Sequence, residues 1–454
     1  MDQAIAGFAK IVPSALAGRV TAVSGLAIDI AGLDAQLSVG DRIAVEARDG
    51  RRIAAEIVGF RGCAARAMAF GDLGGVGPGS AARAALPLRA MAPASRQAFL
   101  APSDGWLGRV VDPMGQPLDG RGALPAGPLL RPVRASPPQA NARARLGPRL
   151  DLGVSALDLF ATCRQGQRLG LFAGSGIGKS SLLAMLARYV ACDVIVFALV
   201  GERGREVREF LEDDLGADGL ARAVVVTATS DAQPLMRREA AYAAMTVAEH
   251  FRDEGKSVLL LMDSVTRFCL ALREIGLSAG EPPATRGYPP SVFAELPRLL
   301  ERAGPGMERA DGPAGQVTAI FTVLVEGDDL TEPVADAVRG ILDGHVVLDR
   351  RIGEAGRYPA VDVLQSLSRT VPGCLEASEH ALVRRARGIL ATYAEVADLV
   401  RLGAYKQGTD PAVDEAVSLA PRIEAALRQD RRERRSLAES FASLAEALEP
   451  SDGA

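Results

Sequence analysis

"LFAGSGIGKSSL", residues 171–182, decides the fold because it joins a strand-like run to a helix-like run through a glycine-rich turn. The overlapping "RLGLF" is apolar enough for a buried strand, and "KSSLLAMLARYV" has apolar residues at helical spacing. Gly174, Gly176 and Gly178 let successive N–H groups point inward, at the positive end of a helix dipole. The stretch therefore predicts a phosphate-binding loop between a strand and a helix.

The residues that follow the glycines suit a nucleotide bound together with Mg²⁺. Lys179 offers a point charge to the β- and γ-phosphates, and Ser180 offers a hydroxyl to the metal. Ala173 stands where the first glycine of the usual pattern lies, and alanine is small enough there if its φ is negative. We expect ATP and Mg²⁺ as ligands, with binding residues Gly174, Ser175, Gly176, Ile177, Gly178, Lys179, Ser180 and Ser181.

Two further strand-like runs end near carboxylates. "SVLLLMDS" contains Asp263 at its end, and "CDVIVFALVGERGREV" leads to Glu202 and Arg203. Parallel strands meet the ligand at their carboxyl ends, so Asp263 can hold Mg²⁺ through water and Glu202 can polarise a water for attack on the γ-phosphate. Arg203 can neutralise phosphate charge. The alternatives are that Asp263 caps the next turn and that Glu202 starts a helix and interacts with its dipole.

The chain divides into segments of different character. Residues 19–92 alternate short apolar runs with turns, which predicts a β-barrel. Residues 93–372 begin with a passage rich in proline and glycine and continue with strand-like runs between helix-like stretches, which predicts a P-loop ATPase domain on a parallel sheet. Residues 373–454 have the spacing of a helical bundle, and residues 1–18 are either a docking segment or a frayed terminus.

The composition narrows the classes of function. The 454 residues are 48% hydrophobic and 24% charged, with a net charge of −4, which argues against electrostatic binding of nucleic acid. Five cysteines without paired spacing favour a reducing compartment. The first residues do not resemble a secretory signal, and no stretch reaches the roughly 18 uninterrupted apolar residues of a membrane span. We expect a cytoplasmic protein.

Six stretches together resemble the rotary-type ATPase family: "AGSGIGKSS", "GERGREVREF", "DSVTRF", "GEPPATRGYPPSVFAELPRLLERAG", "TVLVEGDDLTEPVADAVRGILDGHVVLDR" and "RYPAVDVLQSLSR". Within this family the chain is most similar to the type III secretion ATPases, and among these to the flagellar protein export branch. The resemblance runs from about residue 20 to about residue 410. It implies ATP hydrolysis by an oligomeric motor that drives protein export for flagellum assembly.

The resemblance also implies roles for individual residues. It matches Lys179 and Ser180 to ligands of phosphate and Mg²⁺, Glu202 to the catalytic carboxylate and Asp263 to the aspartate on the Mg²⁺ side. Alanine is common in this branch at the position of Ala173. The remaining matches are Arg203 and Arg267 near the γ-phosphate, Tyr358 against the adenine, and Arg369 as an arginine finger inserted into the neighbouring subunit's site.

An arginine finger supplied in trans makes the active unit an oligomer, which is a homohexameric ring in this family. A finger of this type is worth about 10³ to 10⁵ in rate. By resemblance, the expected partners are a stator-like regulatory subunit, a coiled-coil stalk subunit, the export gate at the inner membrane and export chaperone–cargo complexes, and no nucleic acid. The chain is then expected in the cytoplasm, peripherally associated with the inner membrane.

Three other functions compete with flagellar export. An injectisome ATPase shares nearly every catalytic residue. A catalytic ATP synthase subunit carries an acidic rotor-engaging loop that is missing after "ATYAEVADLVRLG", and a non-catalytic subunit lacks the carboxylate of Glu202. An RNA-translocating ring needs stacking aromatic residues on its N-terminal barrel, where this chain has only Phe60 and Phe70.

Two features of the C-terminal segment depart from a simple match. The run "RQDRRERRS", residues 428–436, is interpreted as a solvated helix face, with partner binding as the alternative. A second aromatic residue on the adenine side, which the resemblance leads us to expect in this region, has no clear counterpart.

Overall fold

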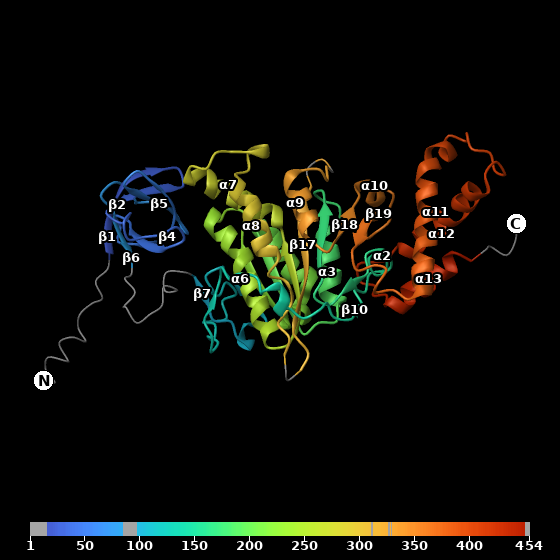
Figure 1. Ribbon diagram of the computed structural model, residues 1–454, viewed down its shortest axis with the longest axis horizontal. Coiled ribbons are helices and arrows are strands. Elements are labelled where there is room, and N and C mark those ends of the chain that lie inside the picture. The colour runs from blue at the N-terminus through green and yellow to red at the C-terminus, as the bar shows by residue number, and fades with distance from the viewer. Residues whose placement is uncertain (1–15, 85–97, 310–311, 326, 328, 450–454) are drawn as a thin grey trace.

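Three regions follow one another along the longest axis of the molecule. The structure, a computed structural model, describes residues 16–84, 98–309, 312–325, 327 and 329–449. A β-barrel lies at one end, a large sheet covered by helices lies in the middle, and a group of helices lies at the other end (Figure 1). The segment 1–15, most of the expected docking segment, lies outside the described residues.

The N-terminal region is a closed antiparallel barrel with its own apolar core. Short strands fit this closure because alternate residues point inward, as the buried Ile28 and Ile30 do in β2. The first strand starts at Leu16, so the barrel includes three residues that the sequence analysis assigned to the N-terminal segment. In the order of the closed barrel its strands are β1 Leu16–Ser24, β2 Ala27–Ala31, β5 Ala64–Ala69, β4 Arg52–Arg61, β3 Arg42–Glu46 and β6 Ala81–Ala84.

The central region is built on one sheet of nine strands within the described residues. Its middle strands are continuous apolar runs, such as "VIVFALV" in β13, because helices cover both faces. In spatial order the strands are β19 Val361–Ser368, β18 Gly344–Leu348, β12 Arg168–Ala173, β17 Gln316–Leu324, β15 Ser257–Asp263, β13 Val194–Val200, β14 Ala223–Ala228 and β8 Arg109–Val111, with β16 Gly304–Pro305 beside β17. Two smaller pairs flank it, β7 Phe99–Leu100 with β9 Arg131–Pro132 and β10 Arg149–Leu150 with β11 Cys163–Arg164.

The parallel sheet expected from the sequence is confirmed, with two antiparallel additions. Strands β8, β14, β13, β15, β17, β12 and β18 pair in parallel, whereas the short β16 runs antiparallel to β17 and β19 runs antiparallel to β18. For β19 the physical reason is the connection: the twelve residues after β18 turn back through a short helix at the same end of the sheet, instead of crossing to the other end before the next strand begins.

The helices lie on both sides of this sheet, and their ends carry ordinary helix signals. Three of them start with proline, which suits the first turn because it lacks an N–H donor. They are α2 Ser155–Phe160, α3 Lys179–Tyr189, α4 Gly204–Glu209, α5 Gly216–Ala221, α6 Pro234–Asp253, α7 Val265–Ala279, α8 Pro290–Leu300, α9 Pro333–Ile341 and α10 Arg350–Glu354, with a π-helical turn at Phe210–Leu215. Short 3₁₀ turns occur at Asp104–Trp106, Ala140–Ala142 and Thr285–Gly287.

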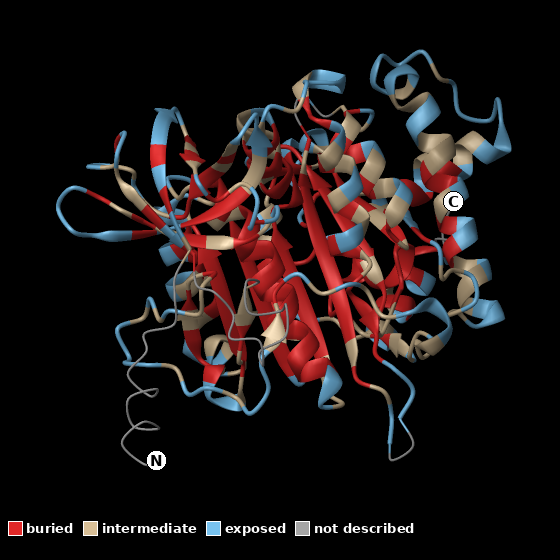
Figure 2. Ribbon diagram, turned by 60° about the vertical axis from the view of Figure 1, so that its left-hand side comes forward, coloured by how far each residue is buried: buried red, intermediate tan, exposed pale blue. Residues whose placement is uncertain are grey.

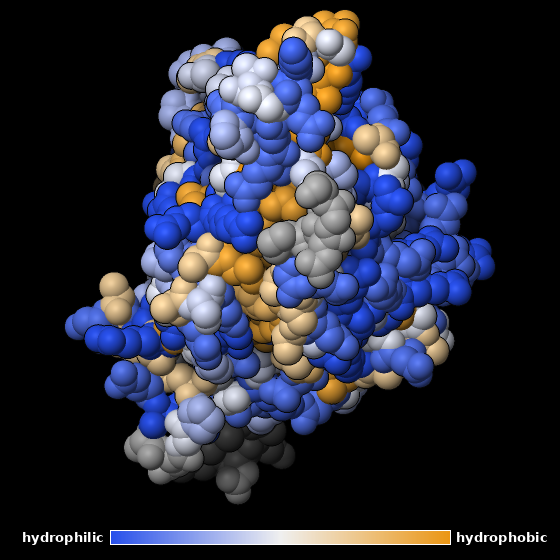
Figure 3. Space-filling view, turned by 90° about the vertical axis from the view of Figure 1, so that its right-hand side faces the viewer, coloured by the Kyte–Doolittle hydropathy of each residue, from blue (hydrophilic) through white to orange (hydrophobic). Residues whose placement is uncertain are grey.

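The C-terminal helices share a hydrophobic core with the sheet domain. They are α11 Ala377–Arg401, α12 Pro411–Leu427 and α13 Leu437–Ala447. Leu419, Ile423 and Phe441 belong to the same buried cluster as Leu171 of β12. The sheet is the most deeply buried part of the molecule, whereas this end presents mainly hydrophilic side chains with small apolar areas between them (Figures 2 and 3). None of the described helices is both long and apolar enough to cross a membrane.

A cluster of charges around the buried Glu56, Arg238 and Glu239 joins the barrel to the sheet domain. Glu56 of β4 and Glu239 of α6 are both bonded to Arg134 and Arg238, at 2.7–3.2 Å, and Arg42 of β3 lies 3.2 Å from Glu239. Burial alone raises the pKa of Glu239, but the guanidinium groups of Arg238, Arg134 and Arg42 outweigh it and lower that pKa to about 2. This interdomain cluster fixes the barrel against α6.

We expect Glu239→Ala to lower the free energy of unfolding by about 3–5 kcal/mol, because it removes one of the two carboxylates that neutralise the three arginines, including the buried Arg238, and leaves only Glu56. Urea denaturation followed by circular dichroism measures this loss. Glu274→Ala is the control, since Glu274 pairs with Arg237 at a position where the carboxylate is 42% exposed, and we expect a loss of at most about 1 kcal/mol. Equal losses in the two variants would show that the interdomain cluster has no special weight.

Candidate active site

The glycine-rich loop has the backbone that the sequence predicts. Ala173 ends β12 and is buried, and Arg286 is the only non-glycine residue with positive φ in the described chain, so the condition on Ala173 holds. Gly176 and Gly178 have φ of 78° and 95°, in the left-handed region that favours glycine. The loop therefore leaves the carboxyl edge of the sheet and enters α3 in a tight turn.

The N-terminus of α3 is open to a ligand. Gly178 is its N-cap, and no side chain of the described residues caps it, so the first N–H groups of the helix stay available to an anion. Ser175 and Ser180 are exposed beside it. Arg350 Nη2 donates to the Ser175 carbonyl at 2.8 Å, which holds the loop from the far side.

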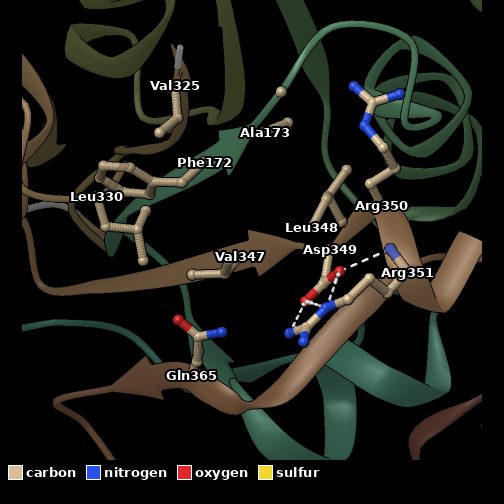
Figure 4. A pocket seen from close by; sticks show the side chains of 11 residues that line it. Phe172, Ala173, Val325, Leu330, Val347, Leu348, Asp349, Arg350, Arg351 and Gln365 are labelled. Carbon is tan, nitrogen blue, oxygen red and sulfur yellow. Dashed lines mark hydrogen bonds and ion pairs between the residues drawn. The ribbon is translucent and has the colours of Figure 1, made fainter. Parts of the chain in front are cut away.

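A cavity of about 240 Å³ lies on that far side of the loop. Figure 4 shows Arg350 pointing toward the loop after Ala173, while Arg351 turns away to pair with Asp349. The floor of this cavity is apolar and includes Phe172 and Val347. The hydrogen bond from Arg350 thus supports the loop on the side of this cavity.

Three charged side chains meet at the carboxyl edge of the sheet, and we call Lys179, Glu202 and Asp263 the charged cluster. The Lys179 ammonium donates to Asp263 Oδ1 and lies 3.9 Å from Glu202 Oε1. Thr322 Oγ1 of β17 donates to the same Asp263 oxygen at 2.7 Å. The side chain that caps α7 is Ser264, not Asp263, so the capping alternative for Asp263 is wrong.

The environment of Glu202 raises the pKa of its carboxyl group to near neutral pH. Burial raises the pKa of Glu202 to about 7, with a further upward contribution from the Asp263 charge, while Lys179 opposes both. A carboxylate with a pKa near 7 is well matched to accept a proton from water at physiological pH.

The two predicted arginines near this cluster differ in position. Arg267 packs against Gly201, whose added Cβ would lie 3.1 Å from the Arg267 side chain, and its buried Nε has no hydrogen-bond partner in the described residues. The side chain of Arg203 is 78% exposed and pairs with Glu206 at 3.3 Å. The structure therefore brings Arg267 to the site and turns Arg203 outward.

Tyr358 lies on the other side of the loop, in a cavity of about 370 Å³. A Cβ on Gly178 would lie 3.6 Å from its ring, so the ring packs directly against the loop. Ser181 and Met185 of α3 line the same cavity. The opposite wall is formed by residues 428–431.

Residues 428–436 correct a sequence-based interpretation, because they form a loop between α12 and α13 and not a solvated helix face. The loop is anchored by Gln429, which is 3% exposed. Its side chain accepts from Ser155 N at 3.0 Å and donates to the carbonyls of Gly153 and Glu433, and its own N–H donates to the Tyr358 carbonyl at 2.9 Å. Alternating charges predicted a helix surface, whereas the buried Gln429 holds the chain in an extended turn.

Arg369 lies at the amino-terminal ends of the parallel strands, whereas the glycine-rich loop lies at their carboxyl ends. Ser368 pairs with Gly344 at the start of β18, while Leu348 at the end of β18 pairs with Ala173. The two ends of β18 are about 13 Å apart along the strand. The exposed Arg369 therefore cannot reach the charged cluster of its own chain.

Sequence reasoning missed three residues of this site. Thr322 carried a weak signal, since it is a hydroxyl in the otherwise apolar run "VTAIFTVL". Arg350 and Gln429 carried none, because each is one of many charged or polar residues in its segment and acts through tertiary contacts.

The fold and site together define a P-loop ATPase: a glycine-rich loop before an uncapped helix, and two carboxylates at neighbouring strand ends. Residues 20–84 match the β-barrel domain of the ATP synthase alpha/beta family, residues 153–368 match its nucleotide-binding domain, and residues 375–446 match the T3SS EscN ATPase C-terminal domain. The chain is 52% identical to the flagellum-specific ATP synthase of Caulobacter vibrioides over 99% of both chains.

Solved structures agree with this match. The assembled ATPase EscN of the enteropathogenic E. coli type III secretion system aligns with a TM-score of 0.86 and 36% identity, over 95% of this chain and 100% of EscN. EscN in complex with its central stalk EscO aligns with a TM-score of 0.82 and 36% identity, with the same coverage. The chain belongs to the family of flagellum-specific ATP synthases, and it is an ATPase.

Proposed function

We propose that this chain is the motor ATPase of type III protein export for flagellum assembly. The observation that carries the proposal is full-length similarity to a flagellum-specific ATP synthase, combined with a carboxylate of pKa about 7 beside the phosphate loop. Binding of nucleotide needs only the loop, whereas hydrolysis also needs a group that accepts a proton from the attacking water. Glu202 supplies that group.

The remaining roles follow from position. Lys179 turns from Asp263 to the β- and γ-phosphates when ATP binds, together with the N–H groups of the loop. Arg267 offers its unpartnered Nε to the γ-phosphate, and Tyr358 packs against the adenine. Arg203, which is exposed, reaches the γ-phosphate only after breaking its pair with Glu206.

The residues present fit Mg²⁺ as well as the nucleotide. Ser180 is an exposed hydroxyl in the first turn of α3, and Asp263 is a carboxylate across from it, lining the same small cavity of about 130 Å³. Mg²⁺ bound with ATP neutralises the charge that develops on the phosphates. Ser180 would bind the metal directly and Asp263 through water.

The position of Arg369 supports an oligomer in which one subunit completes the site of the next. EscN is known as an assembled ATPase and with a central stalk, and we infer a homohexameric ring and a coiled-coil stalk subunit for this chain. By family resemblance the further partners are a stator-like regulatory subunit, the export gate and chaperone–cargo complexes. The proposed location is the cytoplasmic side of the inner membrane, in peripheral association.

Each competing function is less well supported, and a particular observation bears on each. EscN similarity favours an injectisome ATPase as the second candidate. The C-terminal match to the T3SS EscN domain argues against an ATP synthase subunit. An RNA-translocating ring is disfavoured because Phe70 is buried, which leaves Phe60 as the one exposed aromatic ring of the described barrel.

The experiment that tests the export function is complementation in a flagellated bacterium lacking its own export ATPase. We expect the chain to restore ATPase-dependent secretion of hook and filament proteins, and Lys179→Ala to restore none. Active enzyme that supports secretion of virulence effectors but not of flagellar proteins would contradict the flagellar proposal in favour of the injectisome.

We expect Gln429→Ala to raise the KM for ATP about tenfold with a smaller effect on kcat, because the wall opposite Tyr358 loses its buried hydrogen bonds. Steady-state kinetics over a range of ATP concentrations measures both constants. The matched control is Gln116→Ala, since Gln116 is exposed in a distant turn and bonds through its main chain. An unchanged KM in Gln429→Ala would show that residues 428–431 are not part of the site that binds the adenine.

A further inference from the structure

Two donors hold the Asp263 carboxylate on the same oxygen. Thr322 Oγ1 lies 2.7 Å from Oδ1, and the Lys179 ammonium donates to that oxygen as well. Asp263 is 5% exposed and Thr322 is fully buried. The two contacts therefore fix the orientation of the carboxylate and leave Oδ2 on the side away from both donors.

The strand that carries Thr322 has a rigid relation to Asp263. β17 lies between β12 and β15, with Thr322 paired to Leu171 and the adjacent Phe321 paired to Met262. A hydroxyl in this buried apolar strand is unfavourable unless it is hydrogen-bonded, and the β-branched side chain has few rotamers. The position thus offers a fixed donor aimed at one carboxylate oxygen.

The segment that joins Asp263 at the end of β15 to the first turn of α7 is hydrogen-bonded to β17 at a second point. Thr266 Oγ1 accepts from Leu324 N at 2.8 Å, two residues after Thr322 along the strand. Asp263, at the end of β15, and Thr266, in the first turn of α7, are therefore both anchored on the end of β17. Such anchoring keeps the carboxylate in place independently of Lys179.

We infer that Thr322 is a positioning residue for Asp263, an inference that rests on the proposed function. When Lys179 donates to the phosphates of a bound nucleotide, it no longer holds Oδ1. The Thr322 hydroxyl then keeps the carboxylate turned so that its other oxygen accepts from water bound to Mg²⁺. Thr322 thereby sets the affinity of the nucleotide complex for the metal without touching nucleotide or metal itself.

The chain offers a matched control on the same strand. Thr318 lies four residues before Thr322, so both side chains point to the same face of the sheet. Thr318 is 2% exposed, and its hydroxyl accepts from Gly166 N at 2.9 Å, at the edge of the sheet away from Asp263. Substitution of Thr318 thus removes an equally buried hydroxyl that does not contact the charged cluster.

The test is equilibrium binding of fluorescent ADP to the full chain, titrated with Mg²⁺, which needs no hydrolysis. We expect Thr322→Val to raise the half-saturating Mg²⁺ concentration about tenfold, since it removes one hydrogen bond to a charged group. Affinity for ADP in EDTA stays unchanged. Thr322→Ser, which keeps the donor, and Thr318→Val both stay within about twofold of the wild type. Thr322→Ala carries the same expectation as valine if the valine variant does not fold.

The Mg²⁺ titrations of these variants decide whether Thr322 positions Asp263. An unchanged Mg²⁺ dependence in Thr322→Val or Thr322→Ala, or an equal shift in Thr318→Val, overturns the positioning role. Asp263→Asn in the same titration separates this inference from the proposed function. If Asp263→Asn shifts the Mg²⁺ dependence and Thr322→Val does not, only the Thr322 inference fails; if Asp263→Asn has no effect, the proposed metal site itself is wrong.

Discussion

Glu202→Gln is expected to lower kcat for ATP hydrolysis by about 10²- to 10⁴-fold while leaving MgATP binding nearly intact, because glutamine keeps the shape of the side chain but cannot accept a proton from water. Glu202 lies 3.9 Å from Lys179 in the charged cluster, and its side chain is only 15% exposed. Phosphate release measures the rate, and equilibrium binding of labelled nucleotide measures the affinity.

The control for this variant is Glu212→Gln, which removes a charge from the same segment of chain. Glu212 is paired with Arg208 on the surface, with its side chain 61% exposed, and we expect wild-type turnover. Turnover of Glu202→Gln above a tenth of the wild-type rate would take Glu202 out of the proposed role.

The pKa of Glu202 gives the same assignment a second readout. A general base works when deprotonated, and its pKa is raised to about 7, chiefly by burial. We therefore expect kcat/KM, which reports on the free enzyme, to fall about tenfold per pH unit below 7 and to level off above it. The residual activity of Glu202→Gln lacks this limb. A wild-type limb near pH 4.5 would mean that Glu202 is not the titrating base.

The central part of this site is predictable from the sequence because buried parallel strands have continuous apolar sequences. "SVLLLMD" and "VIVFALV" are such runs, and the geometry of a parallel sheet brings their carboxyl ends together. Asp263 lies beside Leu199 in the neighbouring strand, three residues before Glu202, and this position follows from the local apolar pattern and one topological rule. The roles assigned to these residues stay predictions until the variants are measured.

Contacts made through the tertiary fold are what the sequence does not reveal. The charges of residues 428–436 look the same on a solvated helix as on a loop, and only the hydrogen bonds of the buried Gln429 to Ser155 and Gly153 decide between them. The interdomain cluster likewise joins Glu56 to Arg238, 182 residues apart. The propensities of neighbouring residues carry no information about pairs so distant in sequence, and only the tertiary structure reveals them.

Arg369→Ala is expected to lower kcat by about 10³- to 10⁵-fold with little change in nucleotide affinity, because an arginine finger stabilises charge that develops only in the transition state. Arg369 is exposed at the amino-terminal ends of the parallel strands, opposite its own loop, so the proposed finger would have to serve the site of a neighbouring subunit. Arg369→Lys is also expected to be impaired, since a lysine lacks the planar fork of donors. The specific activity of the wild type should rise with protein concentration across the assembly range, and neither variant should show this rise.

Mixing two inactive variants distinguishes a finger in trans from a structural role. A Glu202→Gln subunit keeps its Arg369, and an Arg369→Ala subunit keeps its Glu202, so an interface between the two has one complete site. In a ring with head-to-tail interfaces, random mixing of equal amounts makes about a quarter of the sites complete. We therefore expect the mixture to recover up to about that fraction of wild-type activity, although neither variant alone is active. A mixture as inactive as its components, with ring assembly verified by mass measurement, would show that Arg369 does not act across the interface.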